Sequence, residues 1–512
     1  MRPEAAPADR QADAVSFIET GGLGGDVAQR IDTHAASIFL VGDRAWKMKR
    51  AVHLDYLDFS RLELRKAALE TELRLNRRTA SALYIAVHAI TSDVDGGLAL
   101  DGEGRPVEWL LEMLRFPDDA RLDRHIAANP LPPAVLRRLG DRIHSFHASV
   151  EVSSSPGAAL ALLEVIEGNV SSMRKFPDIL DRTLVRDLAG QHRTLWRSLA
   201  PLLEERRRMG RVRHGHGDLH LTNIAMIDGE AVPFDCLEFS PDLATVDVLY
   251  DLAFLLMDLW HYGCRKEANL VFNRYFDLSP EDEAGLPLLP LFLSMRAAVL
   301  THVLALQAQG AGNKELAAQA QAYLRLASEL VEPVEPRLVA IGGLSGSGKS
   351  TLAASLAHEL GRAPGARIFR SDVLRKRLAG VAPETSLDES RYSLAANAQA
   401  YGLLRSLTVD ALGHGHSAVA DAVFARQPER KAIEAVAGDT GTTFTGIWLA
   451  TEEERRVERV LARTSDASDA DVIIARTQSA YAIGRLDGWV SIDASGAFER
   501  TLEAARLSLR LI

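Results

Sequence analysis

Apolar strand patterns alternate with helical patterns in the last third of the chain. Residues 337–343 have the pattern of a buried strand, with Arg337 followed by apolar residues and two glycines, and further strand patterns follow near 367–371, 417–422, 443–450 and 489–493. Helical patterns lie between them, the first over 351–360. This alternation predicts a doubly wound parallel sheet with helices on both faces, an α/β fold. Ligands of such a sheet bind beyond the carboxyl ends of its strands.

The first two thirds of the chain carry a different pattern, typical of an α+β fold. Two strands with alternating apolar residues flank the turn at Gly42 and Asp43, and a long helical pattern covers 60–79. A further strand pattern covers 108–114. Asp228 and Gly229 form a turn signal between two short strands, 224–227 and 231–234, which predicts a β-hairpin.

A proline-containing segment separates the two patterns. Residues 331–336 include Pro333 and Pro336, and proline both restricts φ and lacks an amide donor, so we predict a linker there. The expected domains are therefore 1–330 and 337–512. A chain of 512 residues exceeds the usual size of a single hydrophobic core, which agrees with this division.

Composition narrows the class of protein. With 47% apolar and 25% charged residues, the chain fits a globular protein rather than a disordered or fibrous one. The net charge of -10 comes from residues 1–336 (-11), because 337–512 carry +1. Neither value favours a nucleic-acid partner. Only two cysteines are present, too few for a disulfide framework, and the first residues lack the apolar core of a signal peptide, so we expect a cytoplasmic protein. We expect no membrane span, because Asp or Pro interrupts the longest apolar stretches.

The segment after the strand at 337–343 has the pattern G-x-x-x-x-G-K-[ST]. Backbone amides of such a loop surround phosphate groups, and the following helix N-terminus adds its positive dipole end. Lys349 would then contact the β- and γ-phosphates of ATP, and Ser350 would bind Mg²⁺. The predicted cofactor-binding residues are Gly343, Ser345, Gly346, Ser347, Gly348, Lys349, Ser350 and Thr351.

Three further features follow predicted strands of this sheet. Asp372 could orient an acceptor hydroxyl or cap the next helix, and Arg375, one turn later, could hold the substrate. Asp421 could act on Mg²⁺ as a Walker-B-like acid or cap a helix. An arginine cluster over 455–463 forms either a lid that neutralises the transferred phosphoryl group or a solvated face paired with glutamates. If it is a lid, Arg459 and Arg463 are the predicted cofactor contacts.

These segments resemble the small P-loop kinases of the gluconate kinase and polynucleotide kinase type. The resemblance rests on GLSGSGKST, FRSDVLRKRLAG, VADAVF and the arginine-rich stretch before RTSDASDAD, and it spans nearly all of 337–512. The phosphate loop is highly specific, and the substrate elements are less so. The resemblance implies transfer of a phosphoryl group from ATP to a hydroxyl.

A second set of polar residues lies at 214–238. Asp218 and Asn223 are five residues apart, and Asp235 follows at the end of an apolar strand. This spacing matches the catalytic loop of protein-kinase-like enzymes, in which the first Asp receives or orients the acceptor hydroxyl while the Asn and the second Asp hold Mg²⁺. His214 and His220 could instead form a metal site with His216. We favour Mg²⁺ on the carboxylates because it prefers oxygen ligands.

This segment resembles the aminoglycoside phosphotransferase and choline kinase family, with its H-G-D-x-x-x-x-N motif. The resemblance implies a bilobal protein-kinase-like fold, with a nucleotide lobe over about 31–115 and a catalytic lobe over about 116–330. It also implies a catalytic role for Asp218, Mg²⁺ binding by Asn223 and Asp235, and a supporting role for His216. Asp247 and Asp251 match structural acidic positions of the family or are helix-surface residues.

The nucleotide lobe of such a fold needs a lysine, a glutamate and a hinge. Ala45-Trp46-Lys47 resembles the A-x-K strand of kinases, so we favour Lys47 for the α- and β-phosphates and keep Lys49 as the alternative. Glu72 or Glu70 would pair with this lysine. The backbone near Met113 would bind adenine. A glycine-rich loop before Lys47 is missing, as is common in the aminoglycoside phosphotransferase branch.

Taken as a whole, the chain resembles a bacterial family that joins an aminoglycoside phosphotransferase-like domain to a P-loop kinase domain. It implies a bifunctional kinase that uses ATP and Mg²⁺ on small-molecule hydroxyl acceptors. Two alternatives remain: a single kinase regulated by an ATP-binding or ATPase P-loop domain, and a carboxy-terminal nucleic-acid 5′-hydroxyl kinase. The acceptors, aminoglycosides among them, and the oligomeric state stay open.

Overall fold

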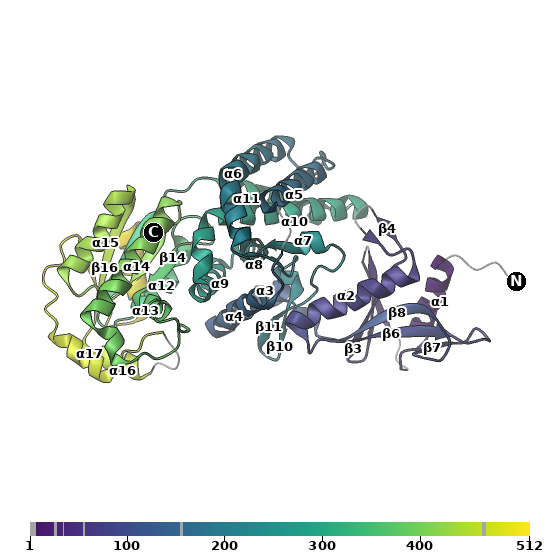
Figure 1. Cartoon of the computed structure of the whole chain (residues 1–512), viewed down its shortest axis with the longest axis horizontal. Coiled ribbons are helices and arrows are strands. Elements are labelled where there is room, and N and C mark those ends of the chain that lie inside the picture. The colour runs from purple at the N-terminus through teal and green to yellow at the C-terminus, as the bar shows by residue number, and fades with distance from the viewer. Residues whose placement is uncertain are drawn as a thin grey trace. The chain divides into compact units, whose positions relative to one another are not determined.

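The computed structural model describes residues 7–24, 28–33, 35–54, 57–153, 157–462 and 467–511 (Figure 1). Contacts between residues divide the chain into two compact units. Unit 1 comprises Met1–Ser154 and Gly210–Asp251, and unit 2 comprises Ser155–Met209 and Leu252–Ile512. The catalytic loop predicted around Asp218 lies in unit 1, whereas the phosphate loop lies in unit 2.

Unit 1 begins with a six-stranded antiparallel sheet in the order β1-β2-β3-β8-β6-β7. The strands are β1 (Gln29–Asp32), β2 (Ala36–Val41), β3 (Arg44–Lys49), β6 (Tyr84–Ser92), β7 (Leu98–Leu100) and β8 (Arg105–Leu114). Because side chains alternate along a strand, Trp46 and Met48 of β3 pack with Ala14 and Ile18 of α1 (Pro7–Glu19) on one face. Lys47 and Lys49 therefore point to the other face. There α2 (Leu62–Ala80) packs on β6 and β8 through Leu69.

The rest of unit 1 is mainly helical and holds two small sheets. Its helices are α3 (Leu122–Ala128), α4 (Pro133–Ser149) and α7 (Pro241–Ala244), with the first turn of α8 (Val248–His261) and the 3-10 turns η1 (Asp118–Ala120) and η2 (Leu221–Asn223). The pairs are β9 (Val212–His214) with β12 (Thr245–Asp247), and β10 (Ile224–Ile227) with β11 (Glu230–Pro233). A further two-stranded pair joins β4 (His53–Leu54) to β5 (Leu57–Asp58).

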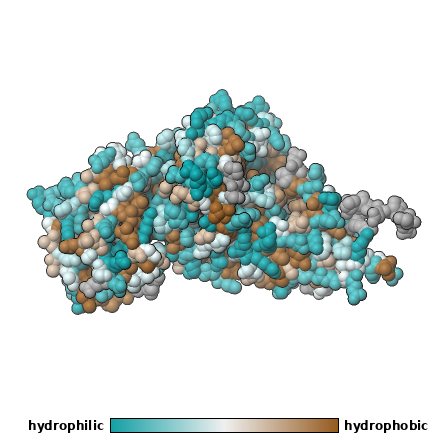
Figure 2. Space-filling view, in the orientation of Figure 1, coloured by the Kyte–Doolittle hydropathy of each residue, from teal (hydrophilic) through white to brown (hydrophobic). Residues whose placement is uncertain are grey.

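Unit 2 contains a group of long helices. They are α5 (Ala158–Met173), α6 (Arg182–Arg208), the rest of α8, α9 (Arg265–Leu278), η3 (Pro280–Leu288), α10 (Leu289–Ala311) and α11 (Lys314–Val331). Among the described residues one helical stretch, Pro280–Ala311, is long and apolar enough to cross a membrane, and 72% of its most apolar window is buried inside the protein. Figure 2 shows one face of the molecule, where hydrophobic residues form separate patches among hydrophilic ones.

The remainder of unit 2 is a five-stranded parallel sheet in the order β14-β15-β13-β16-β17. The strands are β13 (Arg337–Gly343), β14 (Arg367–Arg370), β15 (Ala418–Asp421), β16 (Thr443–Ala450) and β17 (Trp489–Asp493). Its helical segments are α12 (Lys349–Leu356), η4 (Ala357–Glu359), α13 (Ser371–Leu378), η5 (Glu389–Tyr392), α14 (Leu394–Gly413), α15 (Gln427–Thr440), α16 (Glu453–Leu461), α17 (Val472–Thr477), η6 (Gln478–Ala480) and α18 (Phe498–Leu509). The predicted strands and the doubly wound fold are confirmed.

The two compact units do not follow the proline-containing segment. Residues 331–336 form no regular element after the end of α11, as expected for a connection, yet the helices α9 to α11 before it belong to the same unit as the parallel sheet after it. The domain boundary at 331–336 stays a prediction. In terms of contacts, unit 2 contains residues from both sides of it.

Candidate active sites

The first candidate site is built on the loop between β9 and β10 of unit 1. Asp218 lies in this loop, and Asn223 closes it at the end of η2. The side-chain amide of Asn223 donates to Asp218 Oδ2 at 2.8 Å and to the Asp218 carbonyl at 3.0 Å. The five-residue spacing thus brings the two predicted side chains into contact. Asp218 has 37% of its side chain exposed, so its carboxylate is accessible to a ligand.

Asp251 of α8 holds the backbone of this loop. Its two carboxylate oxygens accept hydrogen bonds from the amides of His216 at 2.7 Å and Gly217 at 2.9 Å. His147 Nε2 lies 3.1 Å from Asp251 Oδ2. A Cβ atom on Gly215 would lie 2.5 Å from the same oxygen, so the close approach requires glycine. Asp251 is fully buried, which agrees with the structural role that the family resemblance implied.

The nearby histidines and Asp247 also have structural contacts. His216 Nε2 is 3.0 Å from the Phe234 carbonyl, and Asp247 Oδ1 accepts a hydrogen bond from the Leu249 amide at the start of α8. No group of three or more His, Cys, Asp and Glu side chains suited to a metal ion occurs in the described part of the chain. The alternative of a histidine metal site at 214–220 therefore has no support there.

The β10–β11 hairpin brings Asp235 to the catalytic loop. Its turn residues, Asp228 and Gly229, both have positive φ angles, as the predicted hairpin turn requires. At the open end, the Phe234 amide donates to the Asn223 carbonyl at 2.9 Å. Asp235 itself has a φ of 61°, a rare conformation for a residue with a side chain, and its amide donates to the Tyr84 hydroxyl at 3.1 Å. Such backbone strain persists where the surroundings hold it in place.

Lys47 joins this hairpin to the sheet. Its Nζ lies 2.7 Å from Glu72 Oε1 and 2.9 Å from Asp235 Oδ1. Glu70, the alternative partner, is exposed and pairs with Lys66 at 3.6 Å. The geometry therefore selects Glu72, because only Glu72 lies on the face of α2 that packs toward the sheet. Lys47, Glu72 and Asp235 form the arrangement that the kinase resemblance implied.

Lys49 occupies a second, more buried position beside Lys47. Its Nζ lies 2.7 Å from Glu72 Oε2 and also forms an ion pair with Glu238. Glu72 thus bridges both lysines. Burial alone would raise the pKa of Glu72, but the two lysines outweigh burial and lower it to about 2. Burial raises the pKa of the Glu238 carboxyl, although Lys49 opposes this effect.

The charge of Lys47 is stabilised by its partners. Burial would lower the pKa of the Lys47 ammonium, but Asp235 and Glu72 together raise it well above its ordinary value. Lys47 has 12% of its side chain exposed, compared with 2% for Lys49. The more exposed lysine is therefore the one that a phosphate group can reach, and this supports the choice of Lys47.

Met113, the predicted adenine contact, lies near the end of β8. Its backbone pairs with Ala45 of β3 on one side and with Tyr84 of β6 on the other. Its side chain packs against the cluster of Leu69, Tyr84 and Leu111 beneath α2. This position joins the sheet to the helical part of unit 1. Contact with adenine stays a prediction.

The second candidate site is the phosphate loop of unit 2, between β13 and α12. Gly343, Gly346 and Gly348 all have positive φ angles, which directs the loop backbone through conformations that other residues rarely adopt. Gly346 is also required sterically, because a Cβ atom there would lie 2.3 Å from the Arg456 carbonyl. Lys349 starts the helix, as the motif predicts, and its Nζ lies 3.2 Å from the Leu344 carbonyl.

Ser350 and Asp421 are in direct contact. Ser350 Oγ donates to Asp421 Oδ2 at 2.6 Å, and Arg370 Nε lies 3.6 Å from the same oxygen. Burial raises the pKa of the Asp421 carboxyl, while Arg370 and Lys349 act in the opposite direction. The next helix, α15, begins after Arg426, so Asp421 does not cap it. The hydroxyl and carboxylate form the pair of oxygen donors expected for a Walker-type site.

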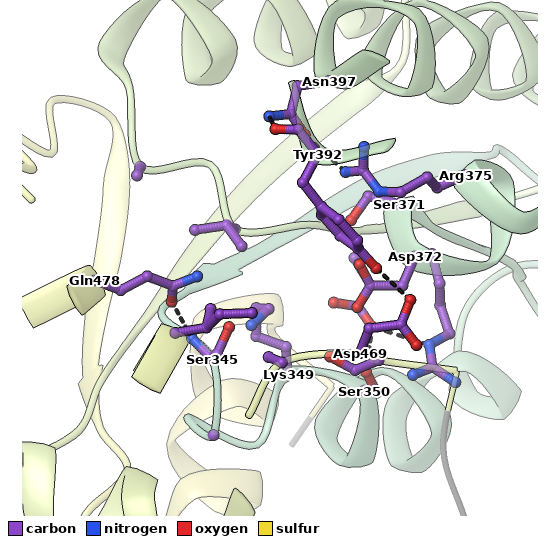
Figure 3. Close-up of a pocket in the computed structure, with 18 of the residues that line it drawn as sticks. Ser345, Lys349, Ser350, Ser371, Asp372, Arg375, Tyr392, Asn397, Asp469 and Gln478 are labelled. Atoms are coloured by element: carbon purple, nitrogen blue, oxygen red, sulfur yellow. Dashed lines mark hydrogen bonds and ion pairs between the residues drawn. The ribbon is translucent and has the colours of Figure 1, made fainter. Parts of the chain in front are cut away.

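A pocket of about 1160 Å³ opens above the loop. Its lining includes most of the predicted residues: Ser345, Gly346, Gly348, Lys349, Ser350, Thr351, Asp372, Arg375, Asp421 and Arg459. Gly343 and Ser347 are buried and are not in the lining. Figure 3 shows the Tyr392 side chain pointing toward Asp469, to which its hydroxyl donates a hydrogen bond, and Lys349 and Ser350 at the start of α12.

Asp372 lies within the first turn of α13, whose N-cap position is Arg370. The alternative role of Asp372 as a helix cap is therefore wrong, and its side chain lines the pocket instead. Arg375 also lines the pocket, but its guanidinium donates to the Arg391 carbonyl at 3.0 Å and to Asn397 Oδ1 at 2.8 Å. These bonds hold the pocket wall, so a substrate contact of Arg375 stays a prediction.

The arginine cluster splits into different environments. Arg455 forms an exposed ion pair with Glu458 at 2.9 Å, as the solvated-face alternative predicted. Arg456 is buried and donates to the Ala475 carbonyl at 2.7 Å and to the Ser345 carbonyl at 3.4 Å. Arg459 donates to the Ser347 carbonyl at 3.4 Å. Two of the arginines therefore contact the phosphate loop; Arg463 lies outside the described residues.

Several site residues were not predicted. Gln478 Oε1 accepts a hydrogen bond from the Ser345 amide at 2.7 Å (Figure 3). Asp469 accepts from Tyr392 and forms an ion pair with the fully buried Lys376 at 2.8 Å. No motif marks these residues. The one available signal was Lys376, a rare lysine next to Arg375 in the segment that carries the P-loop kinase resemblance.

The strand, glycine loop and helix on a parallel sheet define the end of unit 2 as a P-loop nucleoside-triphosphate-binding domain. Residues 338–482 match the family model described as an AAA domain. The chain is also similar to uncharacterised proteins of Mycobacterium tuberculosis and Mycobacterium bovis, each 29% identical over 485 residues, which are 93% of this chain and 94% of the relative.

Solved kinase structures resemble different parts of the chain. A gluconokinase from Sinorhizobium meliloti is 19% identical and covers 35% of this chain and 96% of its own, with a TM-score of 0.25. A choline/ethanolamine kinase family protein from Mesorhizobium loti is 15% identical and covers 63% and 99%, with a TM-score of 0.36. An aminoglycoside 2′-phosphotransferase is 16% identical and covers 62% and 96%, with a TM-score of 0.37.

Proposed function

We propose that this chain is a bifunctional ATP-dependent phosphotransferase. Each site would transfer the γ-phosphoryl group of ATP to a hydroxyl of a small molecule, with Mg²⁺ as the metal ion. One observation carries the proposal: each unit contains its own candidate site. Each site combines a lysine that can bind phosphate with a separate, accessible carboxylate. Phosphoryl transfer depends mainly on positioning and charge neutralisation, which such groups supply.

In unit 1, Asp218 would receive or orient the acceptor hydroxyl. Its exposed carboxylate and its bond to Asn223 support this role, since the bond fixes the carboxylate in the loop. Lys47 would neutralise the α- and β-phosphates while Glu72 keeps it oriented. Asn223 and Asp235 supply oxygen donors of the kind that Mg²⁺ prefers, and few protein ligands suffice because phosphates complete its coordination.

In unit 2, the loop amides and Lys349 would hold the phosphates, and Asp372 would orient the acceptor hydroxyl. The Ser350 hydroxyl and the Asp421 carboxylate, 2.6 Å apart, are oxygen donors that fit Mg²⁺. When bound, the ion would neutralise charge on the phosphates. The pocket of about 1160 Å³ is large enough for a nucleotide and a small acceptor together.

The expected partners are small-molecule hydroxyl acceptors in the cytoplasm. The two cysteines, Cys236 and Cys264, form no disulfide, which supports a reducing compartment. The charge of residues 337–512 is near zero, which does not favour a nucleic-acid acceptor.

The test is a screen of small-molecule alcohols with labelled ATP on the full chain and on two variants, Asp218→Asn and Lys349→Ala. We expect each variant to lose one set of labelled products and keep the other. Lys431→Ala, an exposed lysine of α15 paired only at the surface with Glu434, is the matched control and should keep both sets.

The outcome distinguishes the alternatives. If either variant abolished all transfer, the two sites would be coupled and the regulatory alternative would replace the bifunctional one. Labelling of oligonucleotide 5′ ends that disappears in Lys349→Ala and weakens steeply with salt would identify a nucleic-acid kinase instead.

A further inference from the structure

Strand β14 lies at the edge of the parallel sheet, and helix α9 covers this edge. A sheet edge presents unpaired backbone amides and carbonyls, and proteins usually cover or charge it. Here the Asn273 side chain takes the place of a neighbouring strand: its Oδ1 accepts from the Ile368 amide at 2.7 Å and its Nδ2 donates to the Ala366 carbonyl at 3.2 Å. The amide of Arg367, between them, instead bonds to Ser417 on the β15 side.

Asn269 lies one helical turn before Asn273 and extends the same contact. Its Nδ2 donates to the Pro364 and Ala366 carbonyls, both at 3.0 Å. Both asparagines are buried. Asparagine is a poor helix former, so two of them four residues apart in one helix indicate a specific role. Their side chains pair with the edge of β14 and with the segment that leads into it.

Arg367 of β14 strengthens this contact by charge. It is 2% exposed, and its Nη2 lies 2.8 Å from both Glu283 of η3 and Asp277 of α9. Its Nη1 donates to Asn273 Oδ1 at 3.0 Å. Breaking a buried ion pair by removing one partner is strongly unfavourable, so these residues hold β14 and α9 together.

The contact continues past the end of β14. The strand ends at Arg370, and α13 begins at Ser371, immediately before Asp372. On α13 the guanidinium of Arg377 donates to the Pro280 carbonyl at 3.1 Å and lies 3.7 Å from Glu283. The segment that carries Asp372 is therefore held on both sides, before it through β14 and after it through Arg377.

We propose that α9 and η3 are part of the phosphotransfer site of unit 2, with Asn273 as a positioning residue that acts through β14 on Asp372. This inference rests on the proposed function for the role of Asp372. A site of this kind needs its acceptor-orienting carboxylate fixed within a fraction of an ångström, and a free edge strand would not supply that.

The experiment compares Asn273→Leu with Asn273→Asp in the full chain. Leucine has a similar size but no hydrogen-bonding group, whereas aspartate keeps the acceptor for Ile368 and Arg367. Hydrogen exchange of the Ile368 amide should be at least about tenfold faster in Asn273→Leu and close to the original rate in Asn273→Asp. Lys266→Gln, at the exposed start of α9, is the control and should change neither exchange nor activity.

Kinetics separate positioning from stability. In Asn273→Leu the kcat of the Lys349-dependent reaction should fall at least about tenfold while KM for ATP stays within about twofold, because the loop that binds ATP is untouched. Asn273→Asp should recover most of kcat. Unchanged Ile368 exchange in Asn273→Leu would overturn the proposal, and so would faster exchange with an unchanged kcat.

Two further measurements cover other outcomes. If Asn273→Leu does not fold, Arg377→Gln releases α13 from Pro280 and Glu283 and should lower kcat several-fold with KM for ATP unchanged. If the chain has no Lys349-dependent phosphotransfer, the proposed function fails. The structural contact is then judged by exchange of the Ile368 and Arg375 amides: both should accelerate in Asn273→Leu, and unchanged rates would refute it.

Discussion

Ser350 Oγ and Asp421 Oδ2 lie 2.6 Å apart, although 71 residues separate them in the chain. Ser350 is the second residue of α12, the helix after the phosphate loop, and Asp421 ends the neighbouring strand β15. The parallel pairing of β13 with β15 brings the two ends together. Asp421 is buried, and its carboxylate contacts this hydroxyl and lines the pocket above the loop.

We predict that Asp421→Asn lowers Lys349-dependent ATP turnover by about 100-fold, since a preorganised charge next to the phosphates is lost. The assay uses an Asp218→Asn background, so that only unit 2 contributes. The exposed Asp410→Asn serves as the control. Turnover in Asp421→Asn that matches this control at all Mg²⁺ concentrations would rule out a role in metal binding.

We predict different defects for the two lysines of β3. Lys47→Met should weaken ATP binding to unit 1 at least about tenfold, because the partly exposed charge facing the phosphates is removed. Lys49→Met should instead destabilise unit 1 by about 3 kcal/mol, because it leaves the partly buried Glu238 without its ion-pair partner and the fully buried Glu72 with one lysine fewer. Nucleotide titration and thermal unfolding measure the two effects. The opposite distribution of defects would assign the phosphate contact to Lys49.

Asp251→Asn should impair the catalytic loop of unit 1. The variant keeps the shape of the side chain but replaces one of the two carboxylate oxygens that accept hydrogen bonds from the His216 and Gly217 amides. We expect a loss of about 1.5–3 kcal/mol in stability and a clear fall in Asp218-dependent transfer. Exchange of these two amides and product formation provide the measurements. The same substitution at exposed Asp242 is the control, and Lys349-dependent transfer should not change.

Unit 2 should lose stability as pH falls below about 6.5. Burial lowers the pKa of His192 to about 4, and burial with Arg362 lowers the pKa of His416 to about 3. Each remains neutral when folded but takes up a proton when unfolded, so protonation favours unfolding as pH falls from 6.5 toward the folded value. At pH 5 the loss is about 2 kcal/mol per histidine.

Thermal unfolding of His192→Gln and His416→Gln between pH 7 and pH 5 checks this prediction. Each variant should lose about 2 kcal/mol less stability over that range than the original chain. His53→Gln, an exposed histidine in unit 1, should show the original dependence. A pH dependence that is unchanged in both variants would mean that neither histidine is the titrating group.

Local spacing was sufficient for the centres of both sites. The phosphate loop, the Asp218–Asn223 pair and the Asp228–Gly229 turn each depend on a few consecutive residues, and the structure places each as expected. The strands of the parallel sheet were also predictable, because buried parallel strands form continuous apolar runs between helices. The match to an AAA domain over 338–482 agrees with that prediction.

Contacts across long sequence separations could not be predicted. Glu70 and Glu72 differ only in the face of α2 that they occupy, and the packing of α2 on the sheet decides between them. Gln478 reaches the phosphate loop from 133 residues away. The asparagines of α9 belong to a stretch that precedes the proline-containing segment, so the sequence associated them with the other domain. Tertiary packing determines all of these.

Three side chains of the segment that runs from α16 to η6 donate to or accept from the phosphate loop, and each of these hydrogen bonds is to a backbone group of the loop. Arg456 and Gln478 contact the carbonyl and amide of Ser345, and Arg459 contacts the carbonyl of Ser347. Every amino acid except proline supplies both the amide and the carbonyl, so other substitutions at 345 and 347 keep these backbone groups. We therefore expect relatives to retain Arg456, Arg459, Gln478 and the glycine at 346. Among relatives, invariance at positions more than 100 residues beyond the loop is then the signature of this support.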